Sequence, residues 1–253
     1  MPFLAHLEEL RKRLIVSFIA IGIAFIVVFN FRGILLQLLQ WPLTTDVIMG
    51  RRFPFMGFRH KPPIAPLTAL GPAETLWTHF KVALIGGLLV ALPVVLYQIW
   101  KFIEPGLLPR ERRFALPFVI LSTVSFFLGA AFCLFIVLPL AMKFLLEFDP
   151  TIKQTPRFGE YVDFTLKFLL AFGVIFELPL AMTVAARLGI VTPQFLARNR
   201  KYAILVNFII AAILTPTPDV FNQAMMALPM CLLYEVGIIA ARIVTRRAKP
   251  AEA

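Results

Sequence analysis

The stretch FALPFVILSTVSFFLGAAFCLFIVLPLAM, which runs from Phe114 to Met142, contains no charged side chain. An α-helix rises about 1.5 Å per residue, so about 20 residues cross the roughly 30 Å hydrocarbon core of a bilayer. The stretch exceeds that length, and long uncharged runs of this kind are typical of membrane spans. The sequence therefore predicts a transmembrane helix here.

Similar apolar runs lie on both sides of this stretch, separated by clusters of charge. Together they predict an all-α integral membrane protein with six transmembrane helices, forming a single membrane domain over residues 1–253. The expected spans are 14–31, 76–100, 114–142, 164–186, 202–214 and 220–241, with a long proline- and glycine-rich extracytoplasmic loop over about 32–75.

The composition agrees with this class. Hydrophobic residues make up 60% of the chain and charged residues 15%, whereas soluble domains carry about 25% charged residues. The net charge of +11 could indicate a protein that binds nucleic acid. The basic side chains, however, lie at the ends of apolar runs and form no continuous face. We therefore expect contact with the lipid bilayer and no nucleic-acid partner.

Lys and Arg are unevenly distributed between the two sides of the predicted membrane. Six spans place both termini on one side, where fifteen basic residues lie outside the spans, against eight on the other. Cytoplasmic segments of membrane proteins are enriched in Lys and Arg. The bias therefore predicts that both termini of this multi-pass protein lie in the cytoplasm.

The fifth run is unusually short. Residues 202–214 reach only about 20 Å as a helix, less than the hydrocarbon thickness. The tight segment Thr215–Asp219 joins them to the sixth run, so the two runs form a hairpin of short helices. Either the bilayer thins locally around this hairpin, or Arg200, Lys201 and the turn residues complete the span.

No motif of an enzyme is present in the sequence. There is no phosphate-binding glycine loop, no nucleophile elbow and no cluster with metal-ligand spacing. His6, His60 and His79 are scattered over different segments. We expect no catalytic activity, no metal and no cofactor.

Two acidic positions lie on the side predicted to be cytoplasmic. Glu9 precedes Arg13 by four residues in the N-terminal segment, the favourable order for a helical ion pair. Glu111 lies among Arg110, Arg112 and Arg113 in the loop between the second and third spans. A purely structural interpretation is open for both: Glu9 would belong to a salt-bridged interfacial helix, and Glu111 would relieve basic crowding.

One further acid lies well inside an apolar run. Glu177 belongs to the fourth span, where an ionisable group is expensive and therefore a functional candidate. Pro179 cannot donate a hydrogen bond to the carbonyl of Ile175. The structural alternative is a protonated Glu177 that caps such a carbonyl.

Several separated motifs resemble those of the TatC family, the multispanning subunit of the twin-arginine protein translocase. The resemblance covers nearly the whole chain. The motifs are HLEELRKRL (6–14), YQIWKFIEPGLLPRERR (97–113), FGVIFELP (172–179), TPTPDVFNQ (215–223) and LYE (233–235). The motifs occur in the family's order, and chance similarity between apolar spans would not reproduce those that lie in loops.

The resemblance implies a cup-like bundle of six helices in the cytoplasmic membrane of a bacterium. It implies a receptor for twin-arginine signal peptides on folded cargo, which acts in a multimeric complex with the single-span subunits TatA and TatB and uses the proton-motive force. Implied signal-peptide-binding residues are Glu9, Glu111, Arg11 and Phe102. Glu177 and Gln223 are implied intramembrane polar or partner contacts, and Pro42 and Asp219 match structural hallmarks of the family.

The physical chemistry of the two acids fits this implication. A carboxylate accepts two parallel hydrogen bonds from a guanidinium, which lysine does not offer, so two arginines call for two carboxylates. Basic neighbours would repel a merely cationic peptide.

An alternative function is that of a proton-coupled small-solute transporter that uses Glu177. A passive scaffold is a third interpretation.

Overall fold

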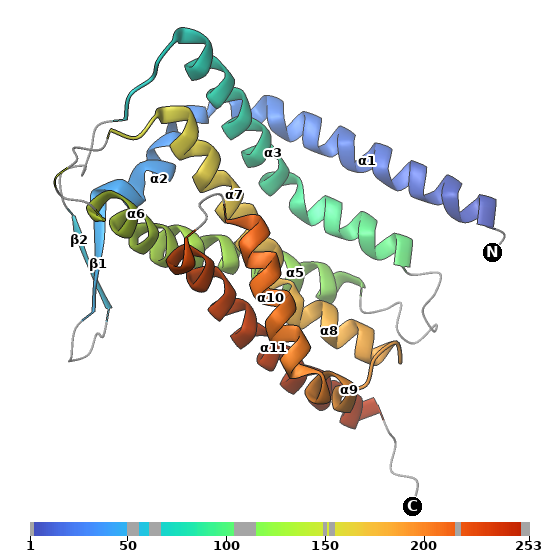
Figure 1. Ribbon diagram of the computed structural model, residues 1–253. Coiled ribbons are helices and arrows are strands. Elements are labelled where there is room, and N and C mark those ends of the chain that lie inside the picture. Colours follow the sequence, from blue (N-terminus) through green and yellow to red (C-terminus); the bar gives the residue numbers. More distant parts are fainter. Residues whose placement is uncertain are drawn as a thin grey trace, which may run out of the picture. The chain divides into compact units, whose positions relative to one another are not determined.

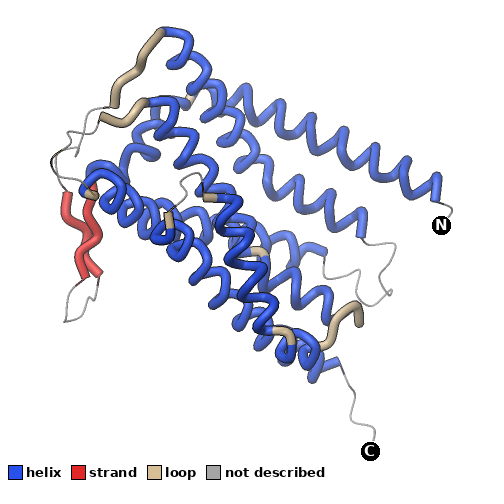
Figure 2. Tube along the Cα trace, in the orientation of Figure 1, coloured by secondary structure: helices blue, strands red, loops and turns tan. Residues whose placement is uncertain are grey.

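The computed structural model describes residues 3–49, 56–60, 67–103, 115–148, 151, 155–215 and 219–248. Helices dominate these residues, and a two-stranded antiparallel hairpin, β1 (Thr45–Met49) with β2 (Met56–His60), is the only sheet within them (Figure 2). The all-α membrane class predicted from the sequence is confirmed. The chain groups into two compact units, residues 1–124 with 142–166 and residues 125–141 with 167–253.

The first unit is built on two long helices, α1 (Phe3–Asn30) and α3 (Pro72–Ile103), which pack along each other (Figure 1). Gly86 and Gly87 of α3 allow their close approach. A Cβ atom on Gly87 would lie 2.8 Å from the backbone N and Cα of Phe25. Helix α3 thus has its two glycines where α1 crosses.

The segment expected to form a long loop over 32–75 contains secondary structure in its first part that the sequence did not predict. It contains α2 (Arg32–Thr44) followed by the β1–β2 hairpin. Leu36, Leu39 and Leu43 are buried at helical spacing. The proline and glycine content of the whole segment obscured this short amphipathic pattern.

The longest uncharged run forms a nearly continuous helix. It comprises α5 (Ala115–Phe132), a π-helical turn (Cys133–Val137) and α6 (Leu138–Glu147). In the second unit, the later part of α5 packs against the later part of α7 (Phe158–Phe176). Gly129 lies directly against the carbonyl of Phe172, and Gly173 lies directly against the ring of Phe126.

The second unit continues with α8 (Leu178–Arg187), α9 (Pro193–Arg198), α10 (Arg200–Leu214) and α11 (Val220–Ala248). Helix α11 packs against α8 and α10. Its core against α8 and α9 consists of Met182, Ala186, Leu196, Ile238 and Ala241. Helix α11 is 29 residues long, longer than predicted, because it continues into basic residues that tolerate helix well.

Five helical stretches within the described residues are long and apolar enough to cross a membrane. The stretches are His6–Asn30, Pro72–Ile103, Leu116–Glu147, Phe158–Arg187 and Val220–Thr245. Helix α10 has 15 residues and so reaches about 22 Å. It is the short fifth helix of the predicted hairpin.

Candidate functional site

The carboxylate of Glu9 is held by a guanidinium of its own chain. Nη2 of Arg13 donates to Oε1 of Glu9 at 3.0 Å, and Nη1 of Arg13 donates to Oε1 of Gln98 at 3.3 Å. The two charged side chains are 21% and 31% exposed. Arg13 therefore joins the start of α1 to the end of α3 and holds the Glu9 carboxylate within reach of solvent.

Phe102 lies next to this pair. Its ring stacks on that of His6, with the ring centroids 4.4 Å apart and the planes at 20°. His6 precedes Glu9 by three residues on α1, and Phe102 follows Gln98 by four on α3. Both contacts thus lie on the same faces of the two helices, because residues three and four apart are neighbours on a helix.

The other two predicted recognition residues are placed differently. Arg11 is exposed on α1, and no contact in the described part of the structure ties it to Glu9. Glu111 lies outside the described residues. The structure therefore brings together Glu9 and Phe102 and adds Arg13, Gln98 and His6 to them.

Only part of this group was predictable from the sequence. The Glu9–Arg13 pair is confirmed, because the i,i+4 spacing on a helix brings such side chains together. Gln98 was missed, since it is 85 residues from Arg13 along the chain. A glutamine at the end of an apolar span was the only local signal.

Glu177 lies where the fourth predicted span is interrupted. It is half-buried between the end of α7 and the start of α8, and Pro179 follows in the first turn of α8. The hydroxyl of Ser125 donates to the carbonyl oxygen of Phe176 at 2.8 Å. The break thus leaves backbone groups that polar side chains satisfy, as expected next to a proline.

The remaining predicted positions have clear structural contacts. Nε2 of Gln223 donates to the carbonyl of Phe208 at 3.1 Å and ties α11 to α10. Oδ1 of Asp219 accepts from the backbone N of Asn222 at 2.7 Å, which is the geometry of a helix N-cap. Pro42 is buried in α2.

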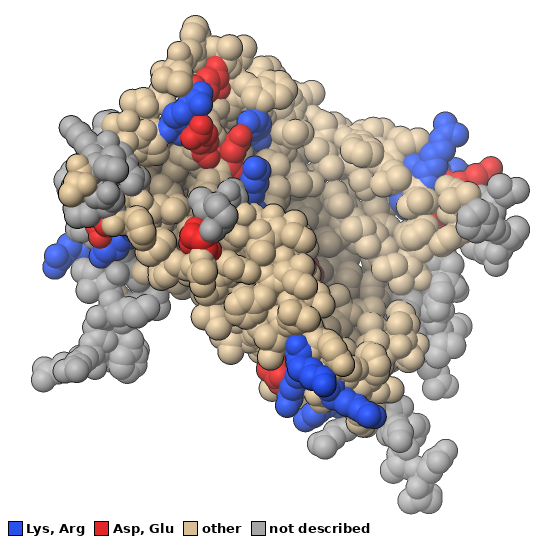
Figure 3. Space-filling view, viewed as in Figure 1, with Lys and Arg blue, Asp and Glu red and all other residues tan. Residues whose placement is uncertain are grey.

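A second charged group lies over the start of α3 and the start of α7, both in the first unit (Figure 3). Nζ of Lys81 lies 2.7 Å from each carboxylate oxygen of Asp163. Glu74 accepts from the backbone N atoms of Leu70 and Gly159, and Arg157 lies 3.7 Å from it. Sequence reasoning missed this group. Lys81, which lies inside the second predicted span, was its only recognisable signal.

The described residues contain no group of three or more His, Cys, Asp and Glu side chains suited to a metal ion. Some of their polar side chains form hydrogen bonds between helices, such as Arg13 with Gln98 and Gln223 with Phe208. Such an arrangement is suited to binding charged groups of a peptide or a neighbouring helix.

Known proteins share both the sequence and the fold. The family model of the Sec-independent protein translocase protein (TatC) matches residues 5–229. A protein of that name from Desulforapulum autotrophicum is 44% identical over 96% of this chain and 84% of its own length. Another from Aquifex aeolicus is 40% identical over 98% of each chain.

A solved structure is similar as well. A crystal structure described as that of the twin-arginine translocase receptor TatC has a TM-score of 0.79 and 39% sequence identity. The similarity covers 95% of this chain and all of the other.

Proposed function

Because this chain belongs to the TatC family of Sec-independent protein translocase proteins, we propose that it recognises twin-arginine signal peptides on folded proteins and mediates their transport. As in its relatives, it is a multi-pass membrane component of the translocase. The residues that would perform the recognition lie at the joined ends of α1 and α3.

The pairing of Arg13 with Glu9 is the observation that carries this proposal. The Glu9 carboxylate is partly exposed and already accepts a guanidinium at hydrogen-bond distance. Arg13 also has Gln98 as a second acceptor, so it can release Glu9 without losing every partner. An arginine of a signal peptide would replace Arg13 at Glu9 and form a charge-assisted hydrogen bond of the same kind.

The aromatic pair beside Glu9 supports the same proposal. The stacked rings of His6 and Phe102 hold the end of α3 against α1. Guanidinium groups stack on aromatic faces, which adds to their recognition by carboxylates. Glu111 is proposed as the acceptor for the second arginine, because it belongs to the loop motif 97–113 that resembles the family's motif.

Basic residues around Glu9 would provide selectivity. Arg11 and Lys12 are both exposed on the same helix. They repel a positively charged peptide that lacks the planar fork needed to bind a carboxylate with two hydrogen bonds. A peptide with paired lysines would therefore bind more weakly than one with paired arginines.

Transport itself would require partners in the membrane. We propose that Glu177 and Gln223 contact the transmembrane helices of TatA- and TatB-type subunits, and that the proton-motive force drives the translocation step. Half-buried Glu177 at the break between α7 and α8 supports this role, since polar groups at membrane depth are costly without a partner. Both termini are proposed to lie in the cytoplasm.

A crosslinking experiment tests the receptor role. A photoreactive signal peptide is added to membranes that contain the wild-type chain, Glu9→Gln or the control Glu8→Gln. Glu8 is the exposed neighbour of Glu9, and its substitution removes the same charge. We expect crosslinking to fall about tenfold for Glu9→Gln, since a hydrogen bond to a charged group contributes about 1.5 kcal/mol or more.

The control and the peptide sequence decide the interpretation. Glu8→Gln should crosslink as the wild type does, and a paired-lysine peptide should crosslink weakly to every variant. Equal crosslinking of the Glu9→Gln and Glu8→Gln variants would show that Glu9 does not bind the signal peptide.

A further inference from the structure

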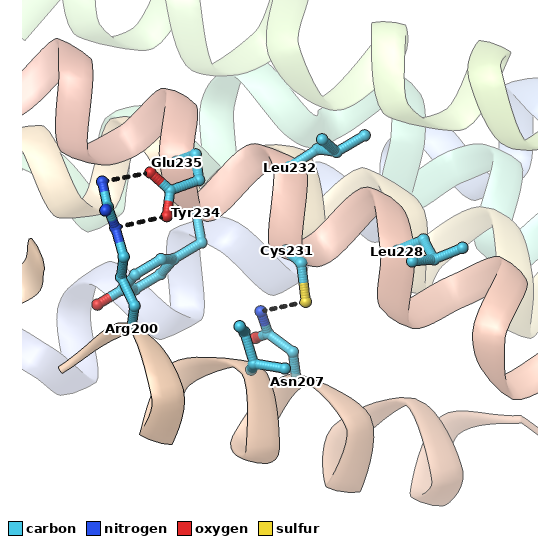
Figure 4. A pocket seen from close by; sticks show the side chains of 8 residues that line it. Arg200, Asn207, Leu228, Cys231, Leu232, Tyr234 and Glu235 are labelled. Atoms are coloured by element: carbon cyan, nitrogen blue, oxygen red, sulfur yellow. Dashed lines mark hydrogen bonds and ion pairs between the residues drawn. The ribbon is translucent and has the colours of Figure 1, made fainter.

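A cavity of about 360 Å³ lies between α10 and α11 in the second unit. Its wall is mostly apolar and includes Ile204 of α10. Leu228, Cys231 and Leu232 of α11 also line it (Figure 4). Volumes of this size are within the usual range of ligand pockets, roughly 300–1,000 Å³. The cavity is therefore large enough to hold part of an apolar molecule.

The apolar rim of this cavity is exposed on the protein surface. Ile204, Leu228 and Leu232 are 48%, 59% and 69% exposed. In a membrane protein, exposed aliphatic side chains on apolar helices face lipid. Acyl chains of the surrounding bilayer thus have direct access to the cavity.

One end of the cavity is charged. Nε of Arg200 lies 2.7 Å from Oε1 of Glu235, and Nη2 of Arg200 donates to Oε2 of Glu235 at 2.8 Å (Figure 4). A guanidinium has five N–H donors, so this pairing leaves three for another acceptor. Arg200 is 49% exposed, and those donors are accessible to a ligand.

Other basic side chains lie close to this end. Lys201 follows Arg200 directly, is exposed, and has its Nζ 5.1 Å from the ring centroid of Tyr202. Arg198 at the end of α9 is also exposed. Of the charged residues, only Arg200 and Glu235 line the cavity. Lys201 and Arg198 are exposed neighbours of Arg200 in the chain, so the surface around the charged end carries more positive than negative charge, which suits an anion.

The charged end is fixed by the packing of α9 against α11. The hydroxyl of Tyr234 donates to the carbonyl of Leu196 at 2.9 Å, and Leu196 belongs to the core shared with α8. Glu235 is the next residue on α11. The position of the Arg200 guanidinium is therefore set before any ligand binds, which lowers the entropic cost of binding.

From this arrangement we propose that the cavity binds an anionic phospholipid. One acyl chain occupies the apolar cavity between α10 and α11, and the phosphate accepts hydrogen bonds from Arg200 and Lys201. Basic pockets between transmembrane helices bind anionic head groups in this manner. The site shares no residue with the group around Glu9, and the proposal goes beyond recognition of the signal peptide.

Lipid binding to the purified full chain tests this proposal. Native mass spectrometry would compare phosphatidylglycerol with phosphatidylcholine that carries the same acyl chains. We expect the chain to bind phosphatidylglycerol about five times more tightly than phosphatidylcholine, or more. One basic residue near an anionic head group has an effect of this size. Lys201→Gln should remove about fivefold of that preference. Lys201 is exposed, so this variant should retain the fold.

A variant that fills the cavity tests the acyl-chain site. Leu232→Trp should abolish the preferential binding of phosphatidylglycerol. Ile239→Trp is the matched control, because Ile239 is also exposed on α11, at 56%, and does not line the cavity. It should bind phosphatidylglycerol as the wild type does.

Four outcomes would overturn the proposal. The first is equal binding of the two lipids by the wild type, and the second is equal binding by the two tryptophan variants. The third is displacement of bound phosphatidylglycerol by an equal concentration of glycerol phosphate, which would show that the cavity contributes nothing. If Leu232→Trp instead keeps lipid binding but prevents co-purification of a single-span partner, the cavity binds a helix and the lipid proposal is wrong.

Discussion

Arg13 has a particular place among the basic residues of α1, because it occupies the carboxylate that we propose for the signal peptide. Its side chain is 31% exposed and contacts both Glu9 and Gln98. Lys12, the adjacent residue, is exposed. In the free chain, the Glu9 carboxylate is thus oriented by a guanidinium that a ligand must displace.

Removal of this internal competitor should strengthen binding of the signal peptide. We expect Arg13→Gln to lower the dissociation constant of a twin-arginine peptide about twofold, since an exposed i,i+4 pair contributes about 0.3–0.5 kcal/mol. Fluorescence anisotropy with a labelled peptide measures the change. Lys12→Gln, which removes the same charge, is the control. Weaker binding by Arg13→Gln alone would mean that Arg13 orients Glu9 and does not compete for it.

A substitution at Glu177 is predicted to affect the binding of partner subunits and not the binding of the signal peptide. Glu177→Ala should reduce co-purification of TatA- and TatB-type subunits several-fold and leave crosslinking of the signal peptide within about twofold of wild type. An intramembrane carboxylate loses its partner contact on this substitution. Ala181→Ser, at an exposed position of α8, serves as a control. Equal loss of both activities would identify Glu177 as a structural residue.

At the scale of single helices, the contact between α1 and α3 depends on backbone proximity. Gly87→Ala would place a Cβ atom 2.8 Å from the backbone of Phe25, and a backbone atom cannot move aside as a flexible side chain does. Overpacking of this kind costs about 1–3 kcal/mol. We expect a lower unfolding temperature in detergent for this variant, together with weaker binding of the signal peptide.

Gly22 provides the matched control for that substitution. It lies on α1 with no atom within 4 Å of an added Cβ. Alanine has the higher helix propensity, so Gly22→Ala should unfold at the wild-type temperature or slightly above it. Equal stability of the Gly87→Ala and Gly22→Ala variants would contradict the close packing of α1 on α3.

The helices also show how much of the fold could be predicted from the sequence. Long apolar runs were predictable because hydropathy is a local property, and each of them forms a helix. Helix α2 was missed because Pro42 lies inside it, and proline usually argues against a helix. The ion pair of Lys81 with Asp163 was missed because only the packing of α3 near α7 brings the two residues together.

At the scale of the whole molecule, the side on which each terminus lies depends on one short helix. Helix α10, at about 22 Å, is shorter than the hydrocarbon core. If α10 crosses, residues 194 and 220 lie on opposite sides and both termini lie on one side. If α10 remains at the surface, these two residues share a side. Local bilayer thinning and the long basic side chains at its start favour a crossing.

Cysteine accessibility distinguishes the two topologies. Single cysteines are introduced at the exposed positions Arg59, Gln194, Val220 and Arg242 and treated with a membrane-impermeant maleimide in intact cells. We expect labelling at 59 and 220 without permeabilisation, and at 194 and 242 only after it, because the excess of Lys and Arg retains their segments in the cytoplasm. The native Cys133 is buried and Cys231 is half-buried in α11, so background labelling of these two residues should be low.

Labelling of 194 and 220 from the same side would show that α10 does not cross the membrane. The C-terminus would then lie opposite the N-terminal Glu9, and the receptor role proposed for the ends of α1 and α3 would be unaffected, since both belong to the first unit.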